Sequence, residues 1–399
     1  MKAQNANRDY LDKLVGIFFL IVLSVCFVLN IGKPISLFIG FANKTATEET
    51  IGNFETDLAQ GFAHKYLFVD MNGLAHKVLL QRTMNDVVLL DNGHGSELFD
   101  QTDFSEKGIG ANADSLARFS EWLGAKDIHL TFMLEPYKCE KGSNHLPDGL
   151  SDYSNELSDG FLNALDNRGV NYLDIRECIK EDGKDYYSLF LKTEHHWKPE
   201  GGFFAFTELC RYLETQYGEE IDPYPLDISH YEQKLYKETS LGYYGDKTGR
   251  IFMPPEDYTL IYPGWKTEQS CEIPHKELIR QGTFYDAVFD KSFFVKGRHG
   301  MYHTYIGGDF PVVLHESETA RNDKTILMFI DSFGIIPEAF LTTEFKHVYA
   351  IDLRWVLRNG MSETAVDFVK EYQPDHVIMA FNPTQLGREE NEQFVYGLE

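Results

Sequence analysis

The sequence predicts an α/β protein with a parallel sheet covered by helices on both faces, preceded by an N-terminal transmembrane helix. Two observations support this fold class. From about residue 61 onward, short apolar runs alternate with amphipathic helical patterns, and such strand–helix–strand alternation is typical of parallel sheets. Near the N-terminus, residues 14–31 form an apolar segment without a single charge.

The predicted elements follow in order along the chain. Strands are expected at 86–90, 128–134, 170–175, 325–330, 348–352 and 376–381. Helices are expected at 111–124, 151–168, 203–218, directly after Ser332, and at 362–372, with Pro199 placed to open the third. Residues 219–322 are rich in Tyr, Pro, Gly and Asp, which indicates an irregular insertion or a small β-rich lobe.

The N-terminal segment is long enough to cross a bilayer. Lysine and arginine favour the cytoplasmic side, and Lys2, Arg8 and Lys13 precede the segment, so the remainder is expected outside. A cleaved signal peptide is the alternative, but no clean small-residue cleavage site follows. A buried core helix fits poorly, because the segment is apolar all round. The expected organisation is a cytoplasmic tail (1–13), an anchor (14–31), a stalk (32–60) and one catalytic domain (61–399).

The chain is strongly acidic, with 37 Lys and Arg against 62 Asp and Glu and a formal charge of −25. Such a surface repels phosphodiester backbones, so nucleic acid is not an expected partner. Plain solubility also explains the charge.

Four cysteines lie in the part expected outside: Cys139, Cys178, Cys210 and Cys271. They could form disulfides in three possible pairings or remain buried thiols. None has C-x-x-C spacing, so neither a zinc site nor dithiol chemistry is expected.

Candidate catalytic residues follow the predicted strands, where open α/β sheets bind ligands. Ser332 follows strand 325–330 at the start of a helix, where its N–H can stabilise an oxyanion. Asn382 follows strand 376–381 and could be a second oxyanion donor, while Arg354 follows strand 348–352 and could bind substrate. A serine nucleophile needs a base held by a carboxylate. In an extended segment Glu194 and His196 share one side, so they are expected to supply carboxylate and base, with His195 pointing away.

Each feature also has a simpler explanation. A serine at a helix start is commonly an N-cap, and an asparagine before proline is an ordinary turn residue. The paired histidines could bind a metal, but adjacent histidines are expected to diverge and no third ligand has helical spacing to them. The three features together, each at the end of a strand, favour catalysis.

The sequence resembles SGNH hydrolase-like proteins of the alginate O-acetyltransferase type, including the DHHW group. Residues 192–201 (KTEHHWKPEG) are similar to that family's T-D-H-H-W element, and residues 326–334 (ILMFIDSFG) to its serine block. Weaker similarity is carried by Pro136 and Lys138, followed by Leu146-Pro147. Glu194 replaces the family's aspartate, which leaves open a non-catalytic descendant.

The resemblance implies a three-layer, flavodoxin-like SGNH fold that is circularly permuted, because the Glu–His block precedes the serine block. It implies O-acyl transfer, with acetyl as the expected group, to a cell-surface or secreted polysaccharide. Ser332, His196 and Glu194 would form the catalytic triad, without metal or organic cofactor. A membrane-bound O-acyltransferase is the implied partner. A carbohydrate acetylesterase and an inactive polysaccharide-binding or export module are the alternatives.

Overall fold

The computed structural model describes residues 2–43, 61–91, 95–143, 145–294, 300–389 and 391–398. The chain forms two compact units, Met1–Leu74 and Ala75–Glu399. The first contains α1 (Lys2–Asn30), α2 (Gly32–Ala42) and most of α5 (Lys65–Val78). Within α1, Lys13–Asn30 is long and apolar enough to cross a membrane, as expected for an anchor. Part of the expected stalk is thus helical, and its residues 44–60 lie outside the described ranges.

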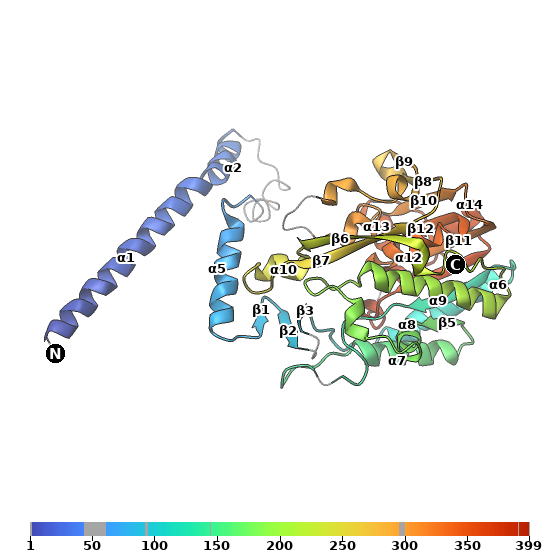
Figure 1. The fold of residues 1–399 in the computed structure, drawn as a ribbon, viewed down its shortest axis with the longest axis horizontal. Coiled ribbons are helices and arrows are strands. Elements are labelled where there is room, and N and C mark those ends of the chain that lie inside the picture. The colour runs from blue at the N-terminus through green and yellow to red at the C-terminus, as the bar shows by residue number, and fades with distance from the viewer. Residues whose placement is uncertain are drawn as a thin grey trace. The chain divides into compact units, whose positions relative to one another are not determined.

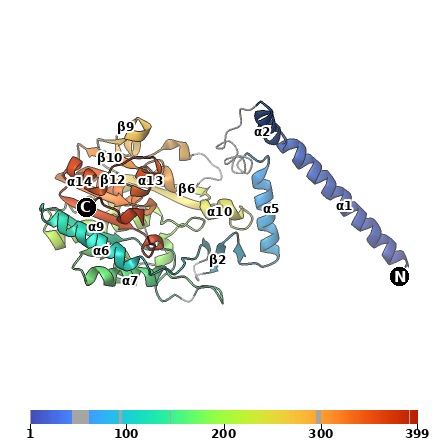
Figure 2. The ribbon, with the colours of Figure 1, turned by 180° about the vertical axis from the view of Figure 1, so that it is seen from behind.

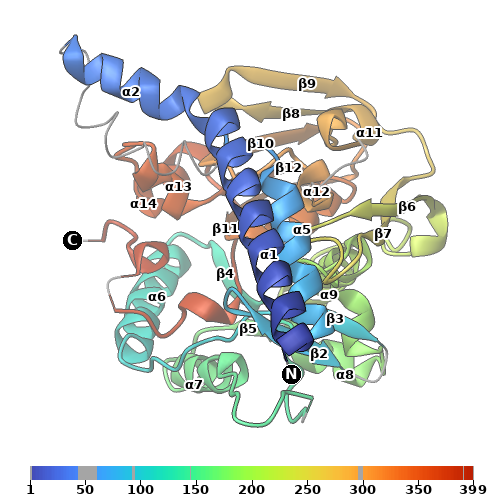
Figure 3. The same cartoon turned by 90° about the vertical axis from the view of Figure 1, so that its left-hand side faces the viewer.

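The second unit is built around an eight-stranded mixed sheet of order β5-β4-β13-β11-β12-β10-β8-β9. The first five strands are parallel, and the last three are joined antiparallel. Figure 3 shows β9 near one edge of this sheet and β5 near the other. The strands are β4 (His129–Leu134), β5 (Tyr172–Asp174), β8 (Gln269–Ile273), β9 (Leu278–Gly282), β10 (Val312–Ser317), β11 (Asn322–Ile330), β12 (Phe345–Ile351) and β13 (His376–Phe381).

The order of the parallel strands determines where a ligand binds. Counted from β11 through β12 and β13 and then back to β4 and β5, the order is 2-1-3-4-5, as in flavodoxin-like sheets. In such sheets the ligand crevice opens where the strand order reverses, which here is between β11 and β13. Ser332 and Asn382 follow these two strands. The circular permutation itself stays a prediction.

Helices cover both faces of the sheet, as the sequence predicts. Val377 and Met379 of β13 pack on one face, whereas Ile378 and Ala380 pack on the other. The first face carries α6 (Ile109–Gly124), α7 (Ser154–Asp166), α13 (Leu353–Arg358) and α14 (Ala365–Tyr372). The second face carries α8 (Ile175–Glu181), α9 (Pro199–Tyr217) and α12 (Ile335–Leu341). Figures 1 and 2 view the unit from opposite sides. In Figure 1 α9 faces the viewer, and in Figure 2 α6 and α7 do.

The region 219–322 is only partly a separate lobe. Strands β6 (Tyr231–Ser240) and β7 (Glu256–Pro263) form a two-stranded ribbon, but β8, β9 and β10 extend the main sheet. The described part of this region also contains the short α-helices α10 (Tyr243–Thr248) and α11 (Phe284–Ala287). The predicted strand at 86–90 belongs to a small antiparallel sheet of β1 (Thr83–Met84), β2 (Val87–Asp91) and β3 (Ser96–Phe99).

All five cysteines are unpaired. Cys139, Cys210 and Cys271 are buried within the core on the α9 face of the sheet. They pack as small apolar side chains. Of the two alternatives, disulfides and buried thiols, the structure therefore has the thiols.

Candidate active site

Ser332 stands where β11 gives way to a short 3₁₀ turn (Ser332–Gly334) and then to α12. The buried Asp331 caps this turn, since its Oδ1 accepts a hydrogen bond from the Phe333 N–H at 2.9 Å. No hydrogen bond from the Ser332 N–H is found in the described part of the chain. This N–H therefore remains available to an oxyanion beside the serine hydroxyl.

The serine hydroxyl contacts the predicted base. His196 Nε2 lies 2.7 Å from Ser332 Oγ, although His196 precedes the serine by more than a hundred residues. The histidine is buried and belongs to a tight turn, in which the Leu191 N–H donates to the His196 carbonyl. The neighbouring Trp197 donates from Nε1 to the Phe333 carbonyl at 3.0 Å, which fastens this turn to the serine block.

Glu194 contacts both histidines, which corrects the expectation for His195. Its Oε1 lies 2.8 Å from His195 Nδ1 and 3.3 Å from His196 Nδ1. The contact to His196 is close enough for an ion pair, but its atoms are not aligned for a hydrogen bond. His195 does not point away, since residues 192–196 form a bend rather than an extended segment. The strict alternation of side chains therefore does not apply.

The pKa values of Glu194, His195 and His196 are shifted in different directions. Burial disfavours the charged form of Glu194, but the neighbouring His195 and then His196 hold its pKa well below the ordinary value. Burial would also lower the pKa of His195, yet Glu194 outweighs it and the pKa is raised. For His196, burial and then the neighbouring His195 charge lower the pKa to about 3. His196 is thus neutral near pH 7, which is the state of a general base.

Tyr302 packs against the imidazole of His196. It comes from the region 219–322, for which the sequence predicts no regular elements. Its ring stacks on the His196 imidazole with centroids 3.9 Å apart and an interplanar angle of 4°. Its hydroxyl donates to the Ser332 and Phe333 carbonyls at 2.7 and 3.1 Å. Tyr302 therefore holds both base and serine turn in place.

Two glycines make room for the glutamate. A Cβ on Gly242 would lie 2.5 Å from Glu194 Cβ and 2.6 Å from its Oε2, and a Cβ on Gly300 would lie 3.3 Å from the same Oε2. The Tyr243 N–H donates to that oxygen at 2.9 Å. The side chain that is one methylene longer than the family's aspartate thus fits a space that only glycine leaves open.

A buried lysine fixes the backbone of the Glu–His turn. Lys138 Nζ donates to the carbonyls of Leu98, Leu191 and Glu194 and lies 3.1 Å from Glu97 Oε2. Its charge is fully buried, but it is neutralised and hydrogen-bonded. The residue that carried a weak family similarity in the sequence therefore has a structural role beside the site.

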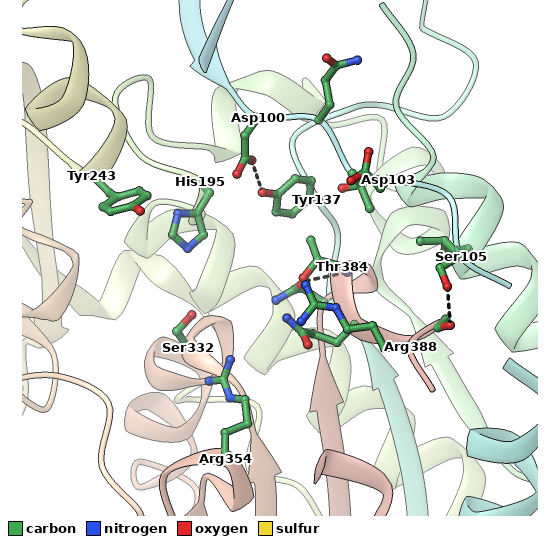
Figure 4. Close-up of a pocket in the computed structure, with 16 residues that line it drawn as sticks. Asp100, Asp103, Ser105, Tyr137, His195, Tyr243, Ser332, Arg354, Thr384 and Arg388 are labelled. Carbon is green, nitrogen blue, oxygen red and sulfur yellow. Dashed lines mark hydrogen bonds between the residues drawn. The ribbon is translucent and has the colours of Figure 1, made fainter. Parts of the chain in front are cut away.

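A cavity of about 470 Å³ opens beside Ser332. Figure 4 shows Tyr243, His195 and Ser332 at one end and Asp103 and Ser105 at the other. Its lining is mostly polar and includes Asp100, Gln101, Thr102, Tyr137, Arg354, Asn382, Thr384, Gln385 and Arg388. A polar lining of this kind suits a hydroxyl-rich ligand better than an apolar one.

Asn382 and Arg354 both line this cavity, as their predicted roles require, and both are oriented by carboxylates. Asn382 Nδ2 donates to Asp331 Oδ2 at 2.7 Å, while its Oδ1 accepts from the Thr384 N–H at 2.9 Å. These contacts assign the amide orientation and leave one N–H proton of Nδ2 for an oxyanion. Arg354 forms a two-pronged pair with Asp352, through Nε at 2.9 Å and Nη2 at 2.6 Å.

The ligand atoms of Glu194, His195 and His196 all lie within 4.8 Å of one another. The expectation that the adjacent histidines diverge is therefore wrong, and this trio has the spacing that a metal ion requires. Two features favour the triad arrangement instead. His196 Nε2 is engaged by Ser332, and Glu194 Oε1 accepts a hydrogen bond from the His195 backbone N–H at 3.1 Å and lies 2.8 Å from His195 Nδ1.

Sequence reasoning missed the parts of the site that lie outside the predicted strands and helices. Tyr302 and Tyr243 lie in the region 219–322, and Tyr137 and Asp100 lie on loops beside the cavity. The Tyr137 hydroxyl and that of Tyr244 both donate to Asp100. The one usable signal was the tyrosine content of residues 219–322, which does not by itself distinguish core residues from site residues.

Comparison with known proteins confirms the expected resemblance. Residues 95–249, which include the Glu–His turn but not Ser332, match the family model of the SGNH hydrolase-like domain of the acetyltransferase AlgX. Bacillus cereus PatB1, solved with a sulfonyl adduct, superimposes with a TM-score of 0.63 at 18% identity, covering 79% of this chain and 99% of PatB1. A DHHW family protein from Eubacterium siraeum gives 0.60 at 18% identity, covering 78% and 95%. No curated protein sequence matches the chain. The fold is thus SGNH hydrolase-like.

Proposed function

We propose that this protein is a serine O-acyltransferase that moves an acetyl group onto hydroxyls of a cell-surface or secreted polysaccharide. The observation that carries the proposal is the 2.7 Å contact between Ser332 Oγ and His196 Nε2. Support comes from the match of residues 95–249 to the domain of an acetyltransferase. The polar cavity beside the serine is also suited to a sugar.

The proposed reaction has two halves. In the first, His196 takes the Ser332 proton while Oγ attacks the acyl carbonyl, and the Ser332 N–H and Asn382 Nδ2 stabilise the oxyanion. The donor leaves with the proton from His196. In the second half an acceptor hydroxyl gives its proton to His196 and attacks the acyl-serine, which returns the proton to Ser332. Glu194 holds the imidazolium that forms in both halves.

Ser332→Ala tests this proposal against a matched control. Ser105 lies at the far end of the same cavity and donates to the Gly387 carbonyl at 3.0 Å, so Ser105→Ala removes an equivalent hydroxyl. Release of p-nitrophenol from p-nitrophenyl acetate should vanish in Ser332→Ala and persist in Ser105→Ala. Equal activity of Ser332→Ala and wild type would leave a binding or export module as the better explanation.

We further propose that Lys13–Asn30 anchors the protein in the cytoplasmic membrane with the catalytic unit outside. The apolar helix and the basic residues before it support this orientation. A membrane-bound O-acyltransferase would then deliver the acyl group from the inside. Protease added to intact protoplasts should digest the bulk of the chain. Survival of the bulk, while a known surface protein is degraded, would contradict the orientation.

A further inference from the structure

His195 lies in the wall of the cavity but is not one of the three residues of the proposed triad. It lies directly beside the base, with the two imidazole centroids 3.8 Å apart, and its side chain is 27% exposed. It lines the same cavity as Ser332. In Figure 4 its ring lies between Tyr243 and Tyr137, on the cavity side opposite Arg354.

The orientation of the His195 ring is fixed. Nδ1 is held at 2.8 Å by Glu194 Oε1, and the rings of Tyr244 and Phe333 lie 5.7 and 5.9 Å away. With Nδ1 engaged, Nε2 is the atom left to meet a ligand. No hydrogen bond to His195 Nε2 is found within the described part of the chain. A fixed polar atom without a partner, at the wall of a cavity, is placed to bind a ligand group.

The position of His195 assigns it to the acceptor rather than to the oxyanion. The oxyanion donors, the Ser332 N–H and Asn382 Nδ2, come from the ends of β11 and β13. The incoming hydroxyl must instead reach His196 Nε2, which removes its proton. A group bound to the adjacent His195 therefore belongs to the same molecule as the attacking hydroxyl.

From this arrangement we propose that His195 Nε2 binds a second hydroxyl of the acceptor, next to the one that attacks, so that the site selects vicinal diols such as sugar rings over water and simple alcohols. This inference rests on the proposed acyltransferase function and names its acceptor class. A hydroxyl can both donate and accept, so it pairs with Nε2 whether the imidazole is neutral or charged. The acetyl group passes from Ser332 Oγ to one acceptor oxygen, and that hydroxyl's proton returns to Ser332 through His196.

The test compares a simple alcohol with a diol and with an oligosaccharide as acceptors. The full-length protein in detergent micelles is acetylated with p-nitrophenyl acetate in the presence of methanol, ethylene glycol or cellotetraose. The ratio of acetylated acceptor to free acetate is then measured by mass spectrometry. At equal hydroxyl concentration the wild type should favour ethylene glycol over methanol by about fivefold, the effect of one hydrogen bond, and cellotetraose by at least as much.

His195→Phe removes both ring nitrogens but keeps an aromatic ring against Tyr244 and Phe333. It should abolish the preference for the diol, and because the preference is a ratio between two acceptors, a slower formation of the acetyl-enzyme does not alter it. His195→Gln, whose amide can donate and accept, should restore part of the preference. His145→Phe makes the same change outside the cavity, where His145 packs against Tyr187, and should keep the full preference.

Three results would overturn the inference. They are a wild type without preference for the diol, a His195→Phe variant that retains it, and a His195→Phe variant that no longer acetylates Ser332. In the last case His195 acts on the triad through Glu194 instead. Failure of the proposed function looks different, because the wild type would then form no acetyl-enzyme at all.

Discussion

Glu194→Gln removes the negative charge of the proposed orienting carboxylate while barely changing its volume. In the native site Oε1 accepts from the His195 backbone N–H and Oε2 accepts from the Tyr243 N–H. An amide can satisfy only one of these donors, because its NH₂ group then faces the other. The change therefore loses a hydrogen bond to a charged group, worth about 1.5–3 kcal/mol of stability.

Glu194→Gln should lower turnover strongly even where the protein stays folded. Without the carboxylate the imidazolium of His196 is no longer stabilised as the acyl group moves, and turnover should fall by about 10²–10⁴-fold. Glu194→Asp should keep part of the activity, because it preserves the charge and is the residue of the resembling family.

The assay is hydrolysis of p-nitrophenyl acetate near pH 7, with the melting temperature measured on the same samples. A folded Glu194→Gln variant with activity within threefold of wild type would refute the assignment of Glu194. The 3.3 Å, poorly aligned contact to His196 makes this a demanding test.

Four further changes have defined outcomes. Gly242→Ala places a methyl group 2.6 Å from Glu194 Oε2 and should destabilise the protein by about 1–3 kcal/mol, measured by urea unfolding, and reduce turnover strongly. Asn382→Ala removes an oxyanion donor and should lower kcat by about 10²–10³-fold; an unchanged kcat would assign the oxyanion elsewhere. Burial and then the nearby Asp331 carboxylate raise the pKa of the Glu135 carboxyl well above its ordinary value, so its protonated form stabilises the fold below about pH 4.3, and this contribution is lost as the pH rises toward the folded-state pKa. Glu135→Gln has no carboxyl to titrate and should not lose this contribution. The unfolding free energy of the variant minus that of wild type should therefore rise by about 1.4 kcal/mol per pH unit over this interval. Dialysis against EDTA should leave esterase activity unchanged, and a loss that Zn²⁺ restores would place a metal at Glu194 and the histidines.

The regular half of the molecule could be predicted from the sequence. Strands β4, β11, β12 and β13 are short apolar runs between amphipathic helices, and the sequence predicts them within a few residues. Since parallel strands bring their carboxyl ends to one edge, the positions of Ser332 and Asn382 at one cavity also followed. The pairing of Ser332 with a histidine far away in sequence depended on triad chemistry and on the family resemblance.

The remaining parts depend on tertiary packing that local patterns do not record. The predicted direction of the His195 side chain was wrong because the Glu–His segment bends. The bend is closed by the hydrogen bond from Leu191 to His196 and held by Lys138. Strand β9 forms the edge of the sheet and β8 lies next to it, and these two short strands lack the continuous apolar run of the parallel strands. Tyr302 reaches the base from an irregular segment, where no periodicity marks a residue as part of a site.

The most direct test of the central claim is to find the residue that carries the acyl group. The full-length protein is mixed with p-nitrophenyl acetate, quenched with acid within the first turnover, and digested for peptide mass mapping. The serine and base geometry predicts one acetyl group on the peptide that contains Ser332 and none in Ser332→Ala. Stoichiometric acetylation of another residue, or turnover by the folded Ser332→Ala variant at the wild-type rate, would contradict it.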